Sequence, residues 1–231
     1  AAVAQEFLCA PGLVDTLLHE LMGSTGSTDF KLLVLHCLFI ILRDADCAVA
    51  LSRRDDVVPC LATQIQQTDY PELAHLGCVT LRMLVSHPEV ETTLPPPLLV
   101  KKPGLVRALV RMVDPASSSF VRDHRSDVLG TLSTLARSSD DALALLKVPE
   151  LLPAIVLALD DARDDEWIMR ANAMDVVLKL SQAPGAMQAI TGTPGLLDTL
   201  VRVVSHGIAD ESVPSPVVSV GLSVLTFLAK D

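Results

Sequence analysis

Pro103-Gly104-Leu105-Val106 is one of five copies of a short phrase that returns along the 231-residue chain. The first aliphatic residue of each copy lies 44 to 48 residues after that of the preceding copy. A repeat of this length is typical of solenoids built from stacked helical units, so it decides the fold class. The other copies are Pro11-Gly12-Leu13-Val14, Asp55-Asp56-Val57-Val58, Pro149-Glu150-Leu151-Leu152 and Pro194-Gly195-Leu196-Leu197.

Aligned on this phrase, the repeats predict a long helix with one buried face. Aliphatic residues stand at positions 0, 1, 4 and 8, which is the spacing of a single stripe on an α-helix. The proline two residues before position zero is expected in the first helical turn, where its missing N–H costs nothing. The four columns are Leu13, Val57, Leu105, Leu151 and Leu196; Val14, Val58, Val106, Leu152 and Leu197; Leu17, Leu61, Leu109, Ile155 and Leu200; and Leu21, Ile65, Val113, Leu159 and Val204.

A polar break and a second long helix follow in each repeat. Two of its columns are aliphatic, and a third contains small residues, including Gly77 and Gly221. Glycine inside a helix costs about 1 kcal/mol relative to alanine, so these positions predict a close approach of two helix backbones. The columns are Ile41, Leu84, Leu135, Leu180 and Leu228; Leu38, Leu81, Leu132, Val177 and Leu225; and Val34, Gly77, Val128, Ala173 and Gly221.

Short segments at residues 45–52, 88–94, 140–147 and 185–190 lead into the next repeat and are predicted to be helices of one or two turns. Each repeat therefore contains one short and two long helices. We expect an all-α, right-handed superhelical solenoid of about five three-helix repeats, forming a single domain over residues 1–231. The repeats are expected to span residues 1–44, 45–87, 88–138, 139–182 and 183–231.

This organisation resembles that of the armadillo repeat family over essentially the whole chain. We count the short helix of each repeat as its first helix, the long helix that carries the phrase as its second, and the other long helix as its third. The resemblance rests on the Pro-Gly-Leu-Val phrase that opens the second helix and on two endings of the third helix. These endings are Thr131-Leu132-Ser133-Thr134-Leu135-Ala136-Arg137 and Val224-Leu225-Thr226-Phe227-Leu228-Ala229-Lys230. HEAT repeats have a similar length but only two helices, and are the nearest alternative.

The resemblance implies that the third helices line a concave groove. In nuclear-import adaptors of this family, Trp and Asn ladders in the groove clamp an extended basic peptide. The Asn-equivalent positions here are Ile40, Met83, Thr134, Lys179 and Phe227, and the Trp-equivalent positions are His36, Val79, Gly130, Asp175 and Ser223. None is Asn or Trp, which argues against a receptor for basic import-cargo peptides, because an Asn amide is needed to pin both the N–H and the C=O of a peptide.

Two interpretations of this mixed groove stay open. In its first half, His36, Ile40, His75, Val79 and Met83 are predicted to accept an apolar or amphipathic partner helix, or else to be buried between neighbouring repeats. In its second half, Asp175 and Lys179 are four residues apart, which favours an ion pair within one helix. Trp167, the sole tryptophan, is either a partner anchor or a packing residue between repeats.

The composition limits the classes of binding partner and the cellular compartment that we expect. The formal net charge is −10, which argues against nucleic acid and against an anionic membrane surface. The five cysteines, none in a CxxC pair, predict reduced thiols in a cytoplasmic or nuclear protein. No basic segment followed by an apolar stretch opens the chain, so no secretory signal is expected. Because the chain opens on Ala1 and polar capping repeats are missing, we expect a piece of a longer protein.

Catalytic and metal chemistry find little support. His36-Cys37 and His75/Cys78 lie on equivalent helices and could together supply four zinc ligands, but Cys37 and Cys78 fall in core-facing columns, which argues against a zinc site. The acidic loop at residues 160–166 lacks the ligand spacing of a calcium loop, and the Gly-Ser-Thr segment at 23–28 lacks the lysine of a phosphate loop. We therefore expect no enzyme activity, no metal and no cofactor.

The sequence therefore favours a non-catalytic scaffold or adaptor that binds a protein or peptide in the groove of the third helices. Two alternatives come from other classes of function. One is a domain that regulates a GTPase or a chaperone, since armadillo-like folds serve in such roles. The other is a structural component of a cytoskeletal or ciliary assembly.

Overall fold

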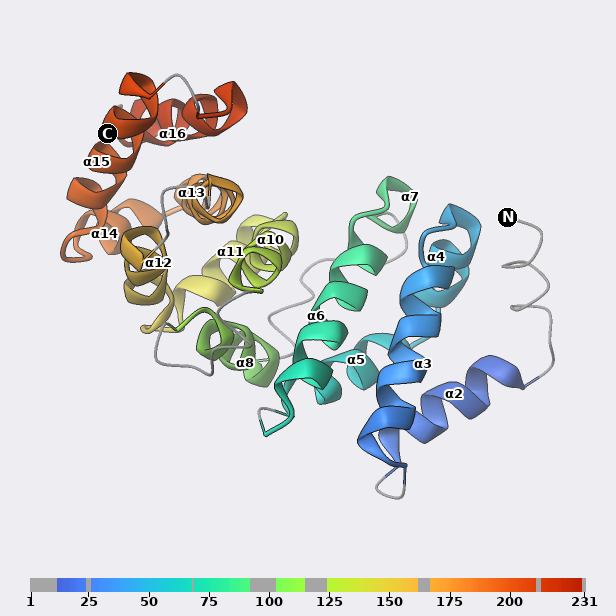
Figure 1. Cartoon of the computed structure of the whole chain (residues 1–231). Helices are drawn as coiled ribbons and strands as arrows, with labels where there is room; N and C mark the ends of the chain where they lie inside the picture. Colours follow the sequence, from blue (N-terminus) through green and yellow to red (C-terminus); the bar gives the residue numbers. More distant parts are fainter. Residues whose placement is uncertain are drawn as a thin grey trace. The chain divides into compact units, whose positions relative to one another are not determined.

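The protein is entirely helical in the part of the chain that the structure describes. The structure is a computed structural model that describes residues 12–23, 26–67, 69–91, 103–114, 124–161, 167–210 and 213–229. These residues form fourteen α-helices and no strand, which confirms the all-α prediction (Figure 1). The helices group into two compact units, Ala1–Pro95 and Pro96–Asp231, each described by itself below. The prediction of one continuous domain stays a prediction.

In the N-terminal unit, helices at equivalent positions of neighbouring repeats pack against each other. The long helix α3 packs against α6, and α2 packs against α5. A hydrogen bond joins α5 to α2: the buried side-chain N–H of Gln64 donates to the Leu21 carbonyl at 2.7 Å. The described helices of this unit are α2 (Leu13–Met22), α3 (Thr28–Ile41), α4 (Ala45–Ser52), α5 (Val57–Ile65), α6 (Pro71–Val85) and α7 (Pro88–Glu91).

The C-terminal unit follows the same arrangement over more helices. The long helices α10, α13 and α16 pack in succession, and so do α8, α12 and α15 (Figure 1). The described helices here are α8 (Pro103–Val113), α10 (Arg125–Leu135), α11 (Ser139–Leu146), α12 (Leu151–Asp161), α13 (Trp167–Ser181), α14 (Ala186–Thr191), α15 (Leu196–Ala209) and α16 (Ser215–Leu228). The four predicted short helices correspond to α4, α7, α11 and α14.

The predicted place of the repeated proline in the first helical turn is wrong at Pro149 and Pro194, because α12 begins at Leu151 and α15 begins at Leu196; Pro11 lies outside the described residues. The chain enters α2 through Gly12 with φ 76° and enters α15 through Gly195 with φ 78°. Each helix then begins at the following leucine, so Pro194 precedes its helix. A left-handed backbone is accessible to glycine without strain, which explains the Gly-Leu pair. Only α8 begins on the proline itself, at Pro103.

The predicted columns form the core. In the second helices of the four later repeats, positions 0, 4 and 8 are buried in every copy, and Leu61, Leu109, Ile155 and Leu200 have no exposed surface. The small column of the third helices is buried as well, including both glycines. A Cβ placed at Gly77 would lie 3.2 Å from Ile65 Cγ1, and one at Gly221 would overlap the Val204 side chain. These distances confirm the predicted close approach between α5 and α6 and between α15 and α16.

Candidate functional site

In the N-terminal unit, the predicted groove residues differ in exposure between the two helices. His36 and Ile40 lie on α3 and are exposed, Ile40 to 60%. His75, Val79 and Met83 lie on α6 and are half-buried. Of the two interpretations, exposure in a groove fits the α3 residues, whereas partial burial between helices describes those on α6.

In the C-terminal unit, the first two predicted positions offer little surface to a partner. Gly130 is buried on α10, so its expected place in an open groove is wrong. Thr134, one turn later, is half-buried, and its hydroxyl donates to the Gly130 carbonyl at 2.8 Å. This hydrogen bond stays within α10 and gives Thr134 a local partner.

Asp175 and Lys179 on α13 are held by α10. The predicted ion pair is present, with Lys179 Nζ 3.3 Å from Asp175 Oδ2. Lys179 Nζ also donates to the Ser133 carbonyl at 3.1 Å and to Ser133 Oγ at 3.0 Å, while the Ser133 hydroxyl donates to Asp175. The two charges therefore neutralise each other and fasten α13 to its neighbour.

The same junction contains a second polar link, seven residues earlier on each helix. Asn172 Nδ2 donates to the Ser126 carbonyl at 2.9 Å and to Ser126 Oγ at 3.2 Å. Ser126 and Ser133 thus present one face of α10 to Asn172 and Lys179 of α13. This pairing defines which side of a third helix meets the next one.

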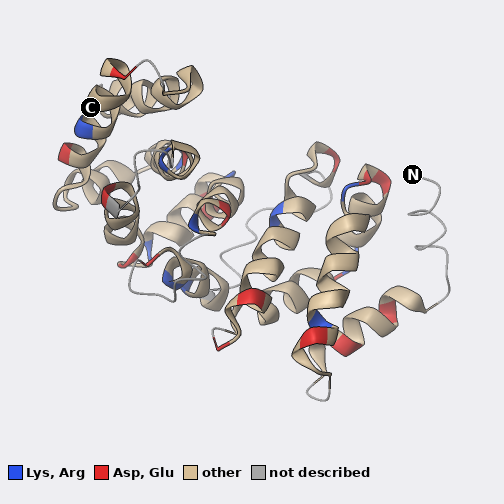
Figure 2. Cartoon of the chain, viewed as in Figure 1, with Lys and Arg blue, Asp and Glu red and all other residues tan. Residues whose placement is uncertain are grey.

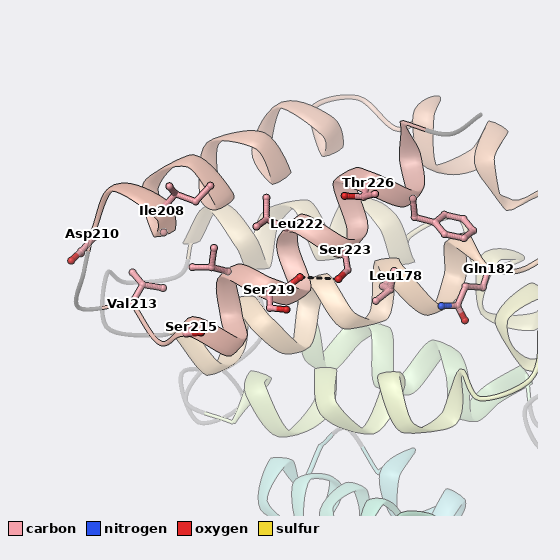
Figure 3. Close-up of a pocket in the computed structure, with 13 residues that line it drawn as sticks. Leu178, Gln182, Ile208, Asp210, Val213, Ser215, Ser219, Leu222, Ser223 and Thr226 are labelled. Carbon is pink, nitrogen blue, oxygen red and sulfur yellow. Dashed lines mark hydrogen bonds between the residues drawn. The ribbon is translucent and has the colours of Figure 1, made fainter.

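The remaining predicted positions, Ser223 and Phe227, line an open pocket of about 870 Å³ along α16 (Figure 3). Residues of α16 make up most of its wall, while Leu178 comes from α13, Gln182 directly follows α13, and Ile208 comes from the end of α15. The α16 residues that line it are Ser215, Val218, Ser219, Leu222, Ser223, Thr226 and Phe227. We call this pocket the α16 groove.

The α16 groove is apolar and hydroxyl-rich, and Asp210 is the one charged residue among those that line it. Helix α16 contains no Lys, Arg, Asp or Glu between Ser215 and Leu228 (Figure 2). The Ser223 hydroxyl donates to the Ser219 carbonyl at 2.8 Å, so this hydroxyl is satisfied within the helix and does not require a polar ligand. Leu222 and Ile208 are exposed to 45% and 60%. Such a surface suits aliphatic side chains of a protein ligand.

Sequence reasoning missed most of this groove. The residues Leu178, Gln182, Ile208 and Val213 come from three other segments, and only their packing around α16 brings them together. One signal was available: the stretch Ser215–Leu228 contains no charged residue, and its polar residues are serine and threonine alone. A helix without a charged face is normally covered, so its exposure marks a contact surface.

Trp167 is buried, with 8% of its surface exposed, which favours the packing role over the anchor role. Its ring stacks on His206 of α15 with centroids 5.8 Å apart, and the Arg170 guanidinium lies 4.6 Å from its ring centroid. Aromatic stacking and a cation–π contact together fix the start of α13 against α15.

The cysteines behave as core residues. Cys47, Cys60 and Cys78 are buried, Cys37 is half-buried, and none of these four described cysteines is in a disulfide. Burial raises the pKa of Cys60 to about 11, and burial together with Asp44 raises the pKa of Cys47 to about 11. Among the four candidate zinc ligands, Cys78 has no exposed surface whereas His36 is exposed, so the two lie in different environments.

The two loops weighed for calcium and phosphate lie partly outside the described residues. At the first, Asp160 accepts hydrogen bonds from Arg202 and from the Thr199 hydroxyl, the latter at 3.1 Å, which commits this carboxylate to α15. At the second, Ser27 accepts a hydrogen bond from the Phe30 N–H at 3.2 Å and caps α3. The described ends of both loops therefore stabilise helices.

Comparisons with models of known protein families and with curated proteins find no match. Within the described segments, no single helix has the length and apolar character needed to cross a membrane. Taken together, α11 and α12 have the length and composition of a membrane span, but the two helices are bent by 84° at the break between them. Both helices bury leucines in the core of the C-terminal unit.

Proposed function

We propose that this chain is a non-catalytic protein-recognition module and that the α16 groove binds an α-helix of a protein partner. The observation that carries the proposal is the combination of an 870 Å³ open pocket with an uncharged helix whose Leu222 stays 45% exposed. Large exposed apolar surface on a folded domain is typical of interaction sites.

The proposal includes an armadillo-type solenoid as the scaffold. Support comes from the order of one short and two long helices, and from the successive packing of α10, α13 and α16 and of α8, α12 and α15. Stacked repeats of this kind offer long surfaces for protein ligands. Fold alone does not specify a ligand, so the proposal rests on the groove.

The chemistry of the groove defines the partner helix. Its apolar wall and neutral α16 favour a ligand face of aliphatic side chains at positions i, i+3, i+7 and i+10. A charged ligand face would lose hydration without gaining an ion pair from α16. We therefore expect a neutral aliphatic stripe rather than a basic or acidic peptide.

The test uses a helical probe of that chemistry. An alanine-based peptide with leucines at i, i+3, i+7 and i+10 carries a fluorophore at its N-terminus and is titrated with the chain, and fluorescence anisotropy follows binding. Saturable binding is expected, and a peptide of the same composition with its leucines scattered around the helix should bind at least ten times more weakly. Leu222→Glu should abolish binding, because a carboxylate would be desolvated in the groove.

The matched control is Leu157→Glu on α12, since Leu157 is 48% exposed and lies outside the groove. This variant should bind the striped peptide as the unmodified chain does. Equal binding of the striped and scattered peptides, or an undiminished affinity of Leu222→Glu, would contradict the proposed site.

A further inference from the structure

Two columns of α12 stay exposed although the helix is packed on both sides. Within the C-terminal unit, α12 contacts α8 before it, α15 after it and α13 of its own repeat. Pro153 and Leu157 lie two and six residues after Leu151, and both are exposed, Leu157 to 48%. These columns therefore point away from the core and from both neighbouring helices. Their exposure belongs to a fully flanked repeat.

Helix α8 carries positive charge in the same two columns. Arg107 and Arg111 lie two and six residues after Leu105, and both are exposed. They are the only charged residues of α8, which shows blue in Figure 2. Being four residues apart, their side chains share one side of the helix. Within the described segments neither arginine takes part in an ion pair, so α8 presents two cations without a neutralising acid.

The two helices together form one mixed surface. Because α8 packs against α12 and the columns are equivalent, Arg107 neighbours Pro153 and Arg111 neighbours Leu157. We call these four residues the outer α8–α12 face. It combines two unneutralised guanidinium groups on one helix with an exposed aliphatic side chain on the next.

The same columns of α15 show a different arrangement. Asp198 and Arg202 stand there, and Arg202 donates to Asp160 of α12. Charges of both signs are present, and the cation already has a carboxylate. The outward side of a surface helix is ordinarily polar in this way. The outer α8–α12 face departs from it twice, by its unneutralised cations and by its exposed leucine.

We propose that the outer α8–α12 face binds an acidic helix of a partner protein, with carboxylates over Arg107 and Arg111 and an aliphatic side chain over Leu157. Charge complementarity selects this occupant, because a guanidinium group binds a carboxylate through two parallel hydrogen bonds. A basic helix would be repelled by the same two arginines. None of the four residues lines the α16 groove, so this second surface does not depend on the proposed function.

The spacing of the arginines specifies the ligand further. Glutamates at positions i and i+4 of a helix are separated by the same distance as Arg107 and Arg111, so two helices lying side by side match both pairs. Leucines at i+1 and i+5 form the next stripe, about 100° around the ligand helix. That stripe reaches α12 when the glutamates lie over α8.

The test uses a peptide with this pattern, which we call the acidic peptide. It is alanine-based, carries glutamates and leucines at the positions given above and a fluorophore at its N-terminus, and is titrated with the chain while fluorescence anisotropy follows binding. A neutral version with glutamines in place of the glutamates should bind about three to ten times more weakly, as expected for two exposed ion pairs. Added salt should weaken the binding of the acidic peptide and leave that of the neutral version nearly unchanged.

Variants of the chain separate the two parts of the face. Arg107→Gln with Arg111→Gln should lower the affinity for the acidic peptide to that for the neutral version, whereas Leu157→Ala should weaken both peptides by the same factor. Arg53→Gln is the matched control, since Arg53 is an exposed arginine in the N-terminal unit, and it should bind the acidic peptide like the unmodified chain. Because every substituted residue is exposed, the variants should keep the circular dichroism and melting temperature of the unmodified chain.

Three results would overturn the inference: equal affinity for the acidic and neutral peptides, an undiminished affinity of the double arginine variant for the acidic peptide, or an equal loss in Arg53→Gln. A further variant, Leu222→Glu, distinguishes the two surfaces. It should bind the acidic peptide like the unmodified chain. A loss of that binding in Leu222→Glu would place the peptide in the α16 groove and would also contradict the inference.

Discussion

Gly221 on α16 is packed against Val204 of α15 so tightly that a methyl group at the glycine would overlap the valine side chain. A Cβ at Gly221 would also lie 3.1 Å from Met174 Sδ, so two helices crowd this one position. Gly77 occupies the same column on α6, where a Cβ would meet Ile65 Cγ1 at 3.2 Å and Gln64 Cβ at 3.4 Å. Steric crowding therefore restricts this column to glycine more strongly in α16 than in α6.

Replacing each glycine with alanine should separate these two positions. Alanine gains about 1 kcal/mol of helix propensity over glycine, whereas overpacking costs about 1–3 kcal/mol. Gly221→Ala is expected to lower the free energy of unfolding by about 1–2 kcal/mol, since overlap with two helices exceeds the gain in propensity. Gly77→Ala should change it by less than about 1 kcal/mol, because the Ile65 side chain can shift. Urea denaturation of both variants measures the difference, and equal effects would show that the close approach in α16 is not stabilising.

Ser133 links Asp175 and Lys179 of α13 to α10, so removing its hydroxyl should be costly. Ser133→Ala removes the hydroxyl that donates to Asp175 and accepts from Lys179, leaving only the bond from Lys179 to the backbone carbonyl, and is expected to lower the free energy of unfolding by about 1 kcal/mol. Thr134→Ala, one residue along, removes only a hydrogen bond within α10 and should cost less than about 0.5 kcal/mol. Chemical denaturation of the two variants tests this, and a smaller loss for Ser133→Ala than for Thr134→Ala would rule out the link.

The buried thiol of Cys60 should make stability fall at alkaline pH. The folded chain holds the thiol form up to a pKa of about 11, whereas the ordinary value is 9.0. The unfolded chain therefore loses this proton first, so the contribution of Cys60 is complete below pH 9 and is lost between pH 9 and 11. Urea denaturation at pH 8, 9 and 10 should show a shallower decline for Cys60→Ala than for the unmodified chain. Identical slopes would indicate that Cys60 is accessible to hydroxide in the folded state.

Accessibility of the thiols gives a further test. In a Cys9→Ser background, the half-buried Cys37 should react with a disulfide reagent at pH 8 well before Cys47 and Cys60, which are 1% exposed. Buried thiols react only when the chain opens locally. Mass spectrometry of peptides from a timed reaction identifies the order. Modification of Cys60 ahead of Cys37 would contradict the burial of α5 against α2.

Trp167 should report on packing rather than on partner binding. Because it is buried between α13 and α15, its emission is expected at short wavelength and with weak quenching by acrylamide. Saturating the α16 groove with the striped peptide should leave this emission unchanged. His206→Ala should shift the emission to longer wavelength by removing the stacked ring. An emission shift on peptide binding would restore the anchor role for Trp167.

The core was predictable because burial repeats with the phrase. Residues such as Leu61, Leu109 and Ile155 share one column of five aligned repeats, and one helical period places them all on the same side. The residue at which each helix begins was less predictable. A proline two residues before a leucine fits a first turn, but the glycine between them adopts a left-handed conformation in two of the copies and delays the helix. Only backbone geometry distinguishes these outcomes.

The binding surface was the least predictable part. The family's groove positions put Lys179 and Asp175 in the open, yet Ser133 of the neighbouring helix binds both. Their role depends on which residue faces them across a junction, and that residue lies about 45 positions away in the sequence. Likewise, Leu222 and Met174 occupy one column and look alike in sequence, but only Met174 is covered by a following helix.

The neutrality of α16 has a kinetic consequence for whatever docks there. Without Lys, Arg, Asp or Glu between Ser215 and Leu228, helix α16 itself adds no long-range attraction for an approaching ligand. Encounters at α16 would then proceed at the unassisted rates of neutral surfaces, about 10⁵–10⁶ M⁻¹s⁻¹, and would change little with ionic strength. Ligands of this surface would therefore differ in affinity almost wholly through their dissociation rates.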